Sequence, residues 1–453
     1  MILKHVLVLP FPAQGHVNPL MHLSHKLAQH GCKVTFVNTE FNHKRVVSAM
    51  NGKVSLEGSK VELISIPDGL GPEEDRNDLV GLALAMMRTM PFALEKVIRD
   101  INSLDGGRKR LTCIIVDTSM AWALEVVQKL GIKGALFIPL SAAIIAMEDN
   151  MQKLIEDGII DSDGFPIRKG KFQVSPEMHT MDTAYLPWCC IGDPITQKNL
   201  YHYIVKLAQC SHLTNWWLSN TTYELEHGAI SVCPKILPIG PLIESAKYRS
   251  MGQFWEEDLS CLNWLNQQPP CSVIYVAFGS LAIFDPWQLK ELALGLELAN
   301  KPFLWVVRED SNSINKLACI EEFQGTRAKI IKWAPQNSVL SHPAVACFIS
   351  HCGWNSVMEG VSNGVPFLCW PYFADQLHNK AYICDVWKVG LGFEFDEKGI
   401  ISRWEIKKKV DQLLGDQNIR VRSKKMKEKV MNSIVEGGKS SENFNKFMDW
   451  LKE

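Results

Sequence analysis

The chain has 453 residues, of which 46% are hydrophobic and 21% charged, and its formal net charge at pH 7 is −1. A chain of this length exceeds one ordinary hydrophobic core, so we expect two domains of roughly 200 residues each. The balanced charge provides no field that would attract nucleic acid or an anionic membrane, so neither is an expected partner.

The first predicted element is a buried strand at residues 5–9. The opening run MILKHVLVLP is not followed by a small-residue cleavage site, so it does not resemble a signal peptide. The longest later apolar stretch, 134–147, is shorter than the ~20 residues that a membrane span needs. The 13 cysteines form no C-x-x-C pair, which favours reduced thiols over a disulfide framework. These features predict a cytoplasmic protein without a membrane span.

Short β-rich runs alternate with helical patterns through the first half of the chain. The predicted strands are residues 5–9, 33–38, 61–66, 112–116 and 134–138. Between the first two, Leu20, Leu23 and Leu27 recur at helical spacing. This alternation predicts βαβ units, and therefore an α/β domain with a doubly wound parallel sheet.

Two polar residues follow strands of this predicted sheet. His16 comes shortly after the first strand, and Asp117 comes directly after the strand at 112–116. Ligands of doubly wound sheets bind beyond the carboxyl ends of the strands, so both side chains are expected at the binding edge. A histidine held by a carboxylate is a general base that works near neutral pH. His16 packing a loop, and Asp117 capping the helix that follows it, are the alternatives; capping is compatible with catalysis.

Proline and glycine interrupt both patterns over residues 237–252, which predicts a domain boundary there. The strand pattern then resumes, and it predicts a second doubly wound domain. Its strands are residues 272–278, 302–307, 329–331, 346–349, 366–369 and 391–395.

A basic helical tail closes the chain. It pauses at 437–438, and Phe444, Phe447, Trp450 and Leu451 then recur at helical spacing, which gives the last helix an apolar face to dock. We therefore expect an N-terminal domain at 1–240, a linker at 241–256, a C-terminal domain at 257–436 and a final helix at 437–453.

Residues 333–376 contain groups suited to a nucleoside. Trp333 offers an aromatic plate for a base, and Gln336 offers an amide for the base and ribose. Glu359 is placed to accept hydrogen bonds from ribose hydroxyls.

The same stretch contains groups suited to a diphosphate and a sugar. Residues 351–356, His-Cys-Gly-Trp-Asn-Ser, lie where a strand passes into a helix. Small residues there let backbone N–H groups approach a diphosphate, and the helix dipole favours its charge. Asp375 and Gln376 follow the next strand and suit sugar hydroxyls.

This segment resembles the signature box of plant secondary-product glycosyltransferases, which use UDP-sugars and act on small molecules. The positions that agree are Trp333, Ala334, Gln336, His342, His351, Cys352, Gly353, Trp354, Asn355, Ser356, Glu359, Gly364, Pro366, Trp370, Pro371, Asp375 and Gln376. The resemblance extends over the whole chain, weakly in the middle of the N-terminal half. It implies the GT-B fold, in which two Rossmann-like domains face each other across a cleft and the last helix returns to the first domain.

The resemblance also implies roles for residues. His16 would take a proton from the acceptor hydroxyl and Asp117 would orient its imidazole, in an inverting reaction without metal or cofactor. Gln376 at the last position of the box favours glucose as the sugar, although xylose, galactose and rhamnose stay open. The implied contacts to the UDP-sugar are Ser280, Trp333, Ala334, Gln336, His351, Trp354, Asn355, Ser356, Glu359, Asp375 and Gln376.

Structural roles are the alternatives for several of these residues. Trp333 could be a core tryptophan, Glu359 an exposed helix residue and Ser280 a turn serine. His351 could merely end a strand. The D-x-D pattern at 161–163 resembles a metal motif, but its Gly- and Pro-flanked setting indicates a turn, and no metal site is expected.

The acceptor is expected to be a hydrophobic small molecule such as a flavonoid, phenolic, terpenoid or steroid, bound by the N-terminal half. Methionine and aromatic residues form deformable apolar pockets, but they are equally ordinary core residues. The candidate lining residues are Met86, Met87, Phe92, Met120, Ser141, Ile145, Tyr185, Leu186 and Trp188.

Two other functions remain open at this point. One is a glycoside-cleaving enzyme on the same fold, and the other is a UDP-sugar-binding protein without transferase activity. The presence of both His16 and Asp117 argues against each of them. A monomer is the expected state.

Overall fold

The computed structural model describes residues 4–50, 60–103, 110–243, 251–280, 282, 285–308 and 327–453. Internal contacts divide the chain into two units, Met1–Glu256 with Ser433–Glu453, and Glu257–Asn432. The first unit thus includes residues 241–256, the segment expected to be a linker. The chain re-enters the first unit at Ser433 rather than at residue 437.

The first unit contains a sheet of seven parallel strands in the order β3-β2-β1-β4-β5-β8-β9. Its strands are β1 (His5–Leu9), β2 (Lys33–Thr39), β3 (Val61–Ile66), β4 (Cys113–Asp117), β5 (Lys133–Ile138), β8 (Trp217–Ser219) and β9 (Ile236–Pro238). The five strands expected from the sequence are confirmed. The short strands β8 and β9 were not predicted. A separate antiparallel pair joins β6 (Lys171–Phe172) and β7 (Met181–Asp182).

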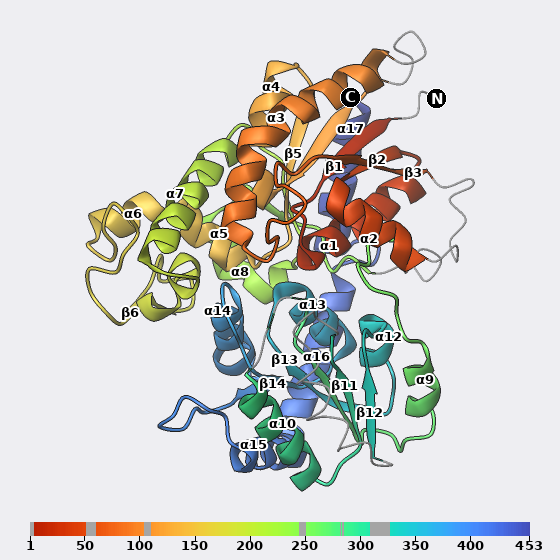
Figure 1. Cartoon of the computed structure of the whole chain (residues 1–453), viewed down its shortest axis with the longest axis vertical. Coiled ribbons are helices and arrows are strands. Elements are labelled where there is room, and N and C mark those ends of the chain that lie inside the picture. Colours follow the sequence, from red (N-terminus) through yellow and green to blue (C-terminus); the bar gives the residue numbers. More distant parts are fainter. Residues whose placement is uncertain are drawn as a thin grey trace. The chain divides into compact units, whose positions relative to one another are not determined.

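Most helices of this unit connect its strands, and α17 closes the chain (Figure 1). They are α1 (Gln14–Gln29), α2 (Glu40–Met50), α3 (Leu79–Ser103), α4 (Ala123–Lys129), α5 (Ala142–Asp149), α6 (Met151–Glu156), α7 (Pro194–Ser211), α8 (Tyr223–Val232) and α17 (Lys439–Lys452). Leu20, Leu23 and Leu27, whose spacing predicted a helix, lie in α1 and are fully buried.

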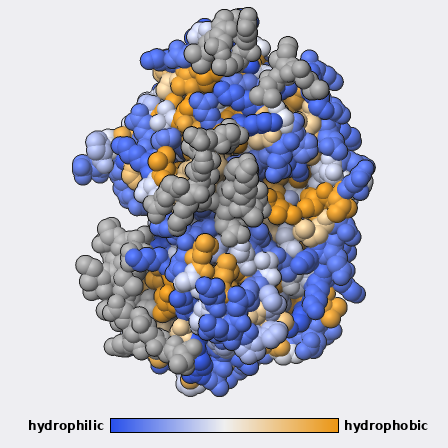
Figure 2. Space-filling model, turned by 90° about the vertical axis from the view of Figure 1, so that its right-hand side faces the viewer, coloured by the Kyte–Doolittle hydropathy of each residue, from blue (hydrophilic) through white to orange (hydrophobic). Residues whose placement is uncertain are grey.

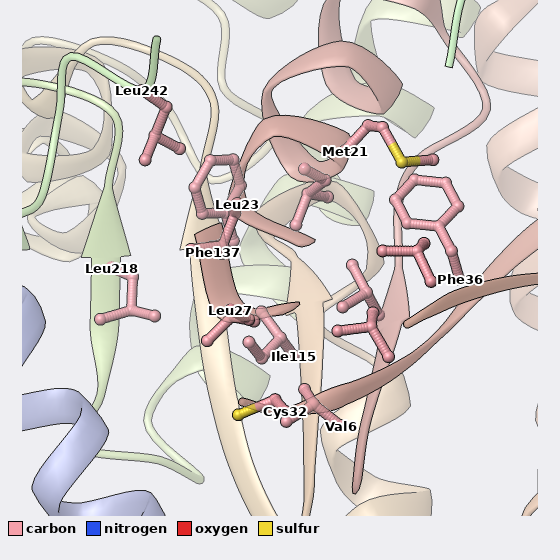
Figure 3. Close-up of a cluster of buried hydrophobic side chains, with 14 of the residues drawn as sticks. Val6, Met21, Leu23, Leu27, Cys32, Phe36, Ile115, Phe137, Leu218 and Leu242 are labelled. Atoms are coloured by element: carbon pink, nitrogen blue, oxygen red, sulfur yellow. The ribbon is translucent and has the colours of Figure 1, made fainter. Parts of the chain in front are cut away.

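One hydrophobic core joins α1 and α17 to the sheet. Figure 3 shows Val6, Ile115 and Phe137 of neighbouring strands on one side of this core. Leu23 and Leu27 of α1 belong to the same cluster. The apolar face of α17 lies in it too, through Phe444, Phe447, Met448 and Leu451. Since alternate strand residues point to opposite faces, buried Leu7 and Leu9 supply the core on the other face.

The second unit contains six parallel strands in the order β12-β11-β10-β13-β14-β15. They are β10 (Val273–Ala277), β11 (Phe303–Val306), β12 (Ala328–Ile331), β13 (Val345–Ser350), β14 (Phe367–Cys369) and β15 (Gly390–Gly392). All six were expected, but β15 ends at Gly392 and not at residue 395.

The helices of the second unit include a π-helical turn, η6 (Tyr382–Val386). The α-helices are α9 (Ser260–Leu265), α10 (Pro286–Leu298), α12 (Gln336–Leu340), α13 (Trp354–Asn363), α14 (Gln376–Ala381), α15 (Arg403–Gly415) and α16 (Gln417–Asn432). Both units are therefore doubly wound α/β sheets, as the sequence predicted.

Hydrophilic residues make up most of the coloured surface on the face drawn in Figure 2, and hydrophobic ones form separate patches. Among the described residues, we find no helix with the length and hydropathy of a membrane span.

Candidate active site

Each sheet has a switch point, where the strand order reverses beside the first strand. In the first unit this point lies between β1 and β4, and in the second unit between β10 and β13. Helices leave the two strands toward opposite faces there, so a crevice opens beyond their carboxyl ends and receives ligands. At the first switch point His16 follows β1 and Asp117 ends β4. At the second, Ser280 follows β10 and His351 follows β13.

At the first switch point, His16 contacts Asp117. His16 Nδ1 lies 2.9 Å from Asp117 Oδ2 and 3.1 Å from Asp117 Oδ1. The Asp117 side chain is fully buried, whereas that of His16 is 17% exposed. A buried carboxylate beside Nδ1 favours the tautomer with the proton on Nδ1, so Nε2 is the basic nitrogen.

Local structure fixes both members of this pair. His16 lies in the first turn of α1, and its ring packs 5.2 Å from the ring of Phe11. Asp117 ends β4, and its Oδ1 accepts a hydrogen bond from Ser119 N at 2.8 Å. The Tyr203 hydroxyl donates to Ser119 O at 2.8 Å. Asp117 therefore caps the 3₁₀ turn Thr118–Met120 and faces His16 at the same time.

At the second switch point, His351 follows β13 and packs between two glycines. A Cβ on Gly279 would lie 2.7 Å from His351 Nε2, and one on Gly353 would lie 2.5 Å from it. Gly279 has φ +70°, a left-handed conformation that favours glycine. Burial lowers the pKa of His351 to about 4, an effect that a hydrogen bond with the Ala277 backbone opposes and the Arg308 charge assists. His351 is therefore neutral at pH 7.

The N-terminus of α13 supplies backbone donors beside His351. Gly353 is its N-cap and offers no side chain to satisfy the first N–H groups. An anion is favoured at such a helix start by these donors and by the helix dipole. The indole of Trp354 is buried and packs 6.4 Å from that of Trp387, so Trp354 can serve a ligand through its backbone.

Side chains predicted to bind the nucleoside form one hydrogen-bonded network. Gln336 Nε2 donates to Ser356 Oγ at 2.9 Å and to Glu359 Oε2 at 2.6 Å. Gln336 Oε1 accepts from the Tyr275 hydroxyl at 3.1 Å. Burial raises the pKa of Tyr275 well above its ordinary value, so its hydroxyl stays a donor. Trp333, three residues before Gln336, is half-buried, and Ala334 is buried.

The residues predicted to bind the sugar are tied to the α14 region. Asp375 Oδ2 accepts from Asn379 Nδ2 at 2.8 Å. The same Asn379 group donates to the carbonyl of Cys352 at 2.9 Å, which links α14 to the His351 turn. Gln376 Oε1 accepts from Tyr372 N at 2.8 Å and from Phe373 N at 3.2 Å. Its carbonyl oxygen closes this turn, and its NH₂ takes no part in these two hydrogen bonds.

Comparison with known proteins shows the family of this chain. Residues 4–156 match the family model described as glycosyltransferase, N-terminal domain, and residues 245–431 match UDP-glucoronosyl and UDP-glucosyl transferase. UDP-glycosyltransferase 83A1 of Arabidopsis thaliana is 44% identical over 99% of this chain and 97% of that protein. The chain belongs to the UDP-glycosyltransferase family.

Further matches of this glycosyltransferase cover nearly its whole length. Linamarin synthase 1 of Manihot esculenta is 34% identical over 98% of this chain and 96% of that protein. The crystal structure of Os79 from O. sativa in complex with UDP has a TM-score of 0.80 at 26% identity, over 98% of this chain and 100% of that one. The two sheets therefore belong to the GT-B fold of these enzymes.

Ser280 follows β10 and is held by a residue that the sequence reasoning missed. Arg308, just after β11, donates to the carbonyl of Ser280 and, at 3.1 Å, to that of Ala282. A charged residue directly after a buried strand was the available signal. Tyr275 and Asn379 were also missed, because each lies inside an element whose pattern reads as ordinary packing.

The nine candidate acceptor residues lie in very different environments. Met86, Met120, Leu186 and Trp188 are at most 1% exposed, whereas Phe92 is 79% exposed. Ser141 caps α5, and Trp188 Nε1 donates to Gly164 O at 2.7 Å. The remaining candidates range from buried Ile145 to exposed Tyr185, with Met87 between them.

Side chains that could hold a metal ion do not cluster in the part of the chain that the structure describes. Within the described ranges, no group of three or more His, Cys, Asp or Glu residues is arranged as a metal site. The two aspartates of the 161–163 turn instead interact with neighbouring protein groups. Asp161 Oδ1 accepts from two backbone N–H groups, and Asp163 pairs with Lys198 at 2.7 Å and His202 at 3.0 Å.

Proposed function

We propose that this glycosyltransferase transfers glucose from UDP-glucose to a hydroxyl of a hydrophobic small molecule, with inversion and without a metal ion. The observation that carries the proposal is the contact between His16 and Asp117 at the first switch point. This pair supplies a base for an acceptor hydroxyl, which silent UDP-sugar binding would not need.

In the proposed reaction His16 Nε2 takes the proton of the acceptor hydroxyl. The acceptor oxygen forms a bond to the anomeric carbon as the bond from that carbon to the UDP oxygen breaks. Asp117 stabilises the imidazolium that forms, since its carboxylate lies 2.9 Å from Nδ1. Attack from the face opposite UDP inverts the anomeric configuration.

The leaving diphosphate would be stabilised by the second switch point. Donors fixed in advance where negative charge develops lower the barrier, because they need no reorganisation during the reaction. The N–H groups at the start of α13 and Ser280 supply such donors. Neutral His351 would contribute a hydrogen bond rather than a charge.

The nature of the acceptor is proposed from the relatives. Their names include a linamarin synthase and a mogroside synthase, and Os79 has been crystallised with a trichothecene. These compounds are small molecules, which supports a small-molecule acceptor here. Glucose rests on Gln376, whose amide hydrogens would meet a sugar hydroxyl. We further propose that the enzyme is cytoplasmic and monomeric.

A mass-spectrometric screen of hydrophobic alcohols and phenols with UDP-glucose tests the proposal. We expect a glucoside of at least one acceptor, with the inverted anomer identified by NMR. His16→Ala should lose more activity on an alcohol than on an acidic phenol, which ionises with less help from a base. Near wild-type turnover of the variant on the alcohol would refute the assignment. A parallel panel of UDP-sugars tests glucose.

A further inference from the structure

Three cysteine thiols of the second unit contact one another near the residues predicted to bind the UDP-sugar. Cys384 Sγ lies 3.8 Å from Cys369 Sγ, and the Cys369 thiol also contacts that of Cys352. Cys352 and Cys369 are buried, whereas Cys384 is partly exposed. An oxidant from solvent can therefore reach one member of the cluster, and a second thiol is in contact to react with the product.

The fold holds Cys384 over the end of β14. Cys384 lies in η6, where Trp387 N donates to Tyr382 O at 2.8 Å, a bond that spans five residues. Such π turns are rare and are frequent at functional sites. Ile383 packs so closely on β15 that a Cβ at Gly390 would lie 2.7 Å from its Cγ2. This contact seats η6 against the sheet.

We propose that Cys369 and Cys384 form a reversible disulfide when the enzyme meets a peroxide, and that this bond weakens binding of the UDP-sugar. The first half depends only on the thiol geometry, and the second half rests on the proposed function.

The chemistry balances with hydrogen peroxide as oxidant. The Cys384 thiolate attacks one peroxide oxygen, which forms an S–O bond, breaks the O–O bond and releases water after protonation. The Cys369 thiolate then attacks the Cys384 sulfur, which forms the S–S bond and breaks the S–O bond; the hydroxide that leaves takes a proton from solvent and becomes a second water. Because burial raises the pKa of Cys369 well above its ordinary value, the second step should be faster at alkaline pH.

The disulfide would affect the predicted UDP-sugar site through the residues between the two cysteines. Residues 370–383 join the two cysteines and include Asp375 and Gln376. A covalent bond is shorter than the present contact, so β14 and η6 must approach each other. A misplacement of about 1 Å can cost on the order of a hundredfold in rate. Asn379 would transmit the shift to the Cys352 carbonyl, beside His351.

The test exposes the full-length enzyme to hydrogen peroxide and maps disulfides by mass spectrometry of its peptides. The wild type should yield a peptide pair joined through Cys369 and Cys384, which dithiothreitol separates. Cys384→Ser should yield none and keep the basal activity. Cys271→Ser removes an exposed cysteine away from the cluster and should behave as the wild type.

Calorimetry of UDP-glucose and UDP binding, before and after oxidation, tests the second half. We expect affinity for UDP-glucose to fall about tenfold after oxidation, with a smaller change for UDP, and to recover on reduction. The absence of the Cys369–Cys384 pair, or a Cys352–Cys369 pair in its place, would overturn the assignment. Equal affinities of the reduced and the oxidised enzyme for UDP-glucose would overturn the proposed effect on UDP-sugar binding. If the reduced enzyme bound no UDP-glucose, the proposed function would fail while the disulfide result still stood.

Discussion

His16 and Asp117 are 101 positions apart in the chain, yet Nδ1 of one lies 2.9 Å from Oδ2 of the other. The parallel pairing of β1 with β4 produces this contact, because Leu9 pairs with Val116 and both strands end at the same edge. The same Asp117 also accepts a hydrogen bond from Ser119 N, so its position does not depend on the histidine. A substitution can therefore remove the charge and keep the cap.

Asp117→Asn should lower kcat/KM by about 10²- to 10⁴-fold, the usual range for general-base assistance. Asparagine is as good a cap as aspartate, so the melting temperature should stay close to that of the wild type. Steady-state kinetics and thermal unfolding measure the two effects. Asp193→Asn, which changes the exposed cap of α7, is the matched control. Unchanged kinetics in Asp117→Asn would show that Asp117 is only a cap.

Trp333→Ala should weaken UDP binding, because stacking of a base on an aromatic ring contributes about 1–3 kcal/mol. The backbone contact of this residue, in which Asp258 N donates to Trp333 O at 2.9 Å, does not need the side chain. Calorimetry with UDP measures the loss. Trp404→Ala removes an exposed tryptophan of the same unit and should bind normally. An equal Kd in Trp333→Ala and the wild type would exclude the stacking role.

Removal of metal ions should leave turnover unchanged. The proposed stabilisation of the diphosphate uses N–H groups of α13, Ser280 and neutral His351, so a divalent cation has no assigned part. Assays in EDTA, and in EDTA followed by excess Mg²⁺, measure this. A fall in EDTA that Mg²⁺ restores would mean that a cation supplies part of the stabilisation.

The sequence was sufficient to predict the strands that carry the site. β1 and β3 have the predicted bounds, because apolar residues dominate each run and a proline, Pro10 or Pro67, directly follows it. β8 and β9 have three residues each and were not predicted. β9 runs into residues 237–252, where proline and glycine argue against a strand.

Residue types and order predicted which groups belong to the candidate site, but not which hydrogen bonds each group makes. Sequence alone could not show that the side-chain carbonyl oxygen of Gln376 accepts hydrogen bonds from the backbone N–H groups of Tyr372 and Phe373. It also could not show that Tyr275 orients Gln336, because a tyrosine in an apolar strand reads as core. Such hydrogen bonds depend on which strands become neighbours, and this is a tertiary property.

Buried Glu226 should give the enzyme a distinctive dependence of stability on pH. Its carboxylate accepts from Ala142 N at 3.0 Å, Ala143 N at 3.1 Å and the Thr221 hydroxyl at 2.6 Å, at the start of α5. Burial nevertheless raises the pKa of Glu226 to about 7, against these hydrogen bonds.

Between pH ~4.5 and 7 the folded state therefore binds more protons at Glu226 than the unfolded state does, so this contribution to stability falls as the pH rises. The contribution of Glu226 to stability is fully present below its pKa in the unfolded chain. It is lost as the pH rises through its pKa in the folded state, and the whole change is on the order of 3 kcal/mol. His22 and His25 act in the opposite sense, because burial lowers the pKa of each to about 4. The stability they contribute rises with pH up to their unfolded pKa.

Comparison with Glu226→Gln isolates the glutamate, since both histidines remain in each protein. The difference in melting temperature, wild type minus variant, should decrease from pH 5 to about 7 and level off by pH 8, as measured by thermal unfolding in matched buffers. Glu224→Gln, at an exposed position of the same helix, should show no such trend. A difference that is constant across this range would mean that Glu226 has the same charge in the folded and the unfolded chain.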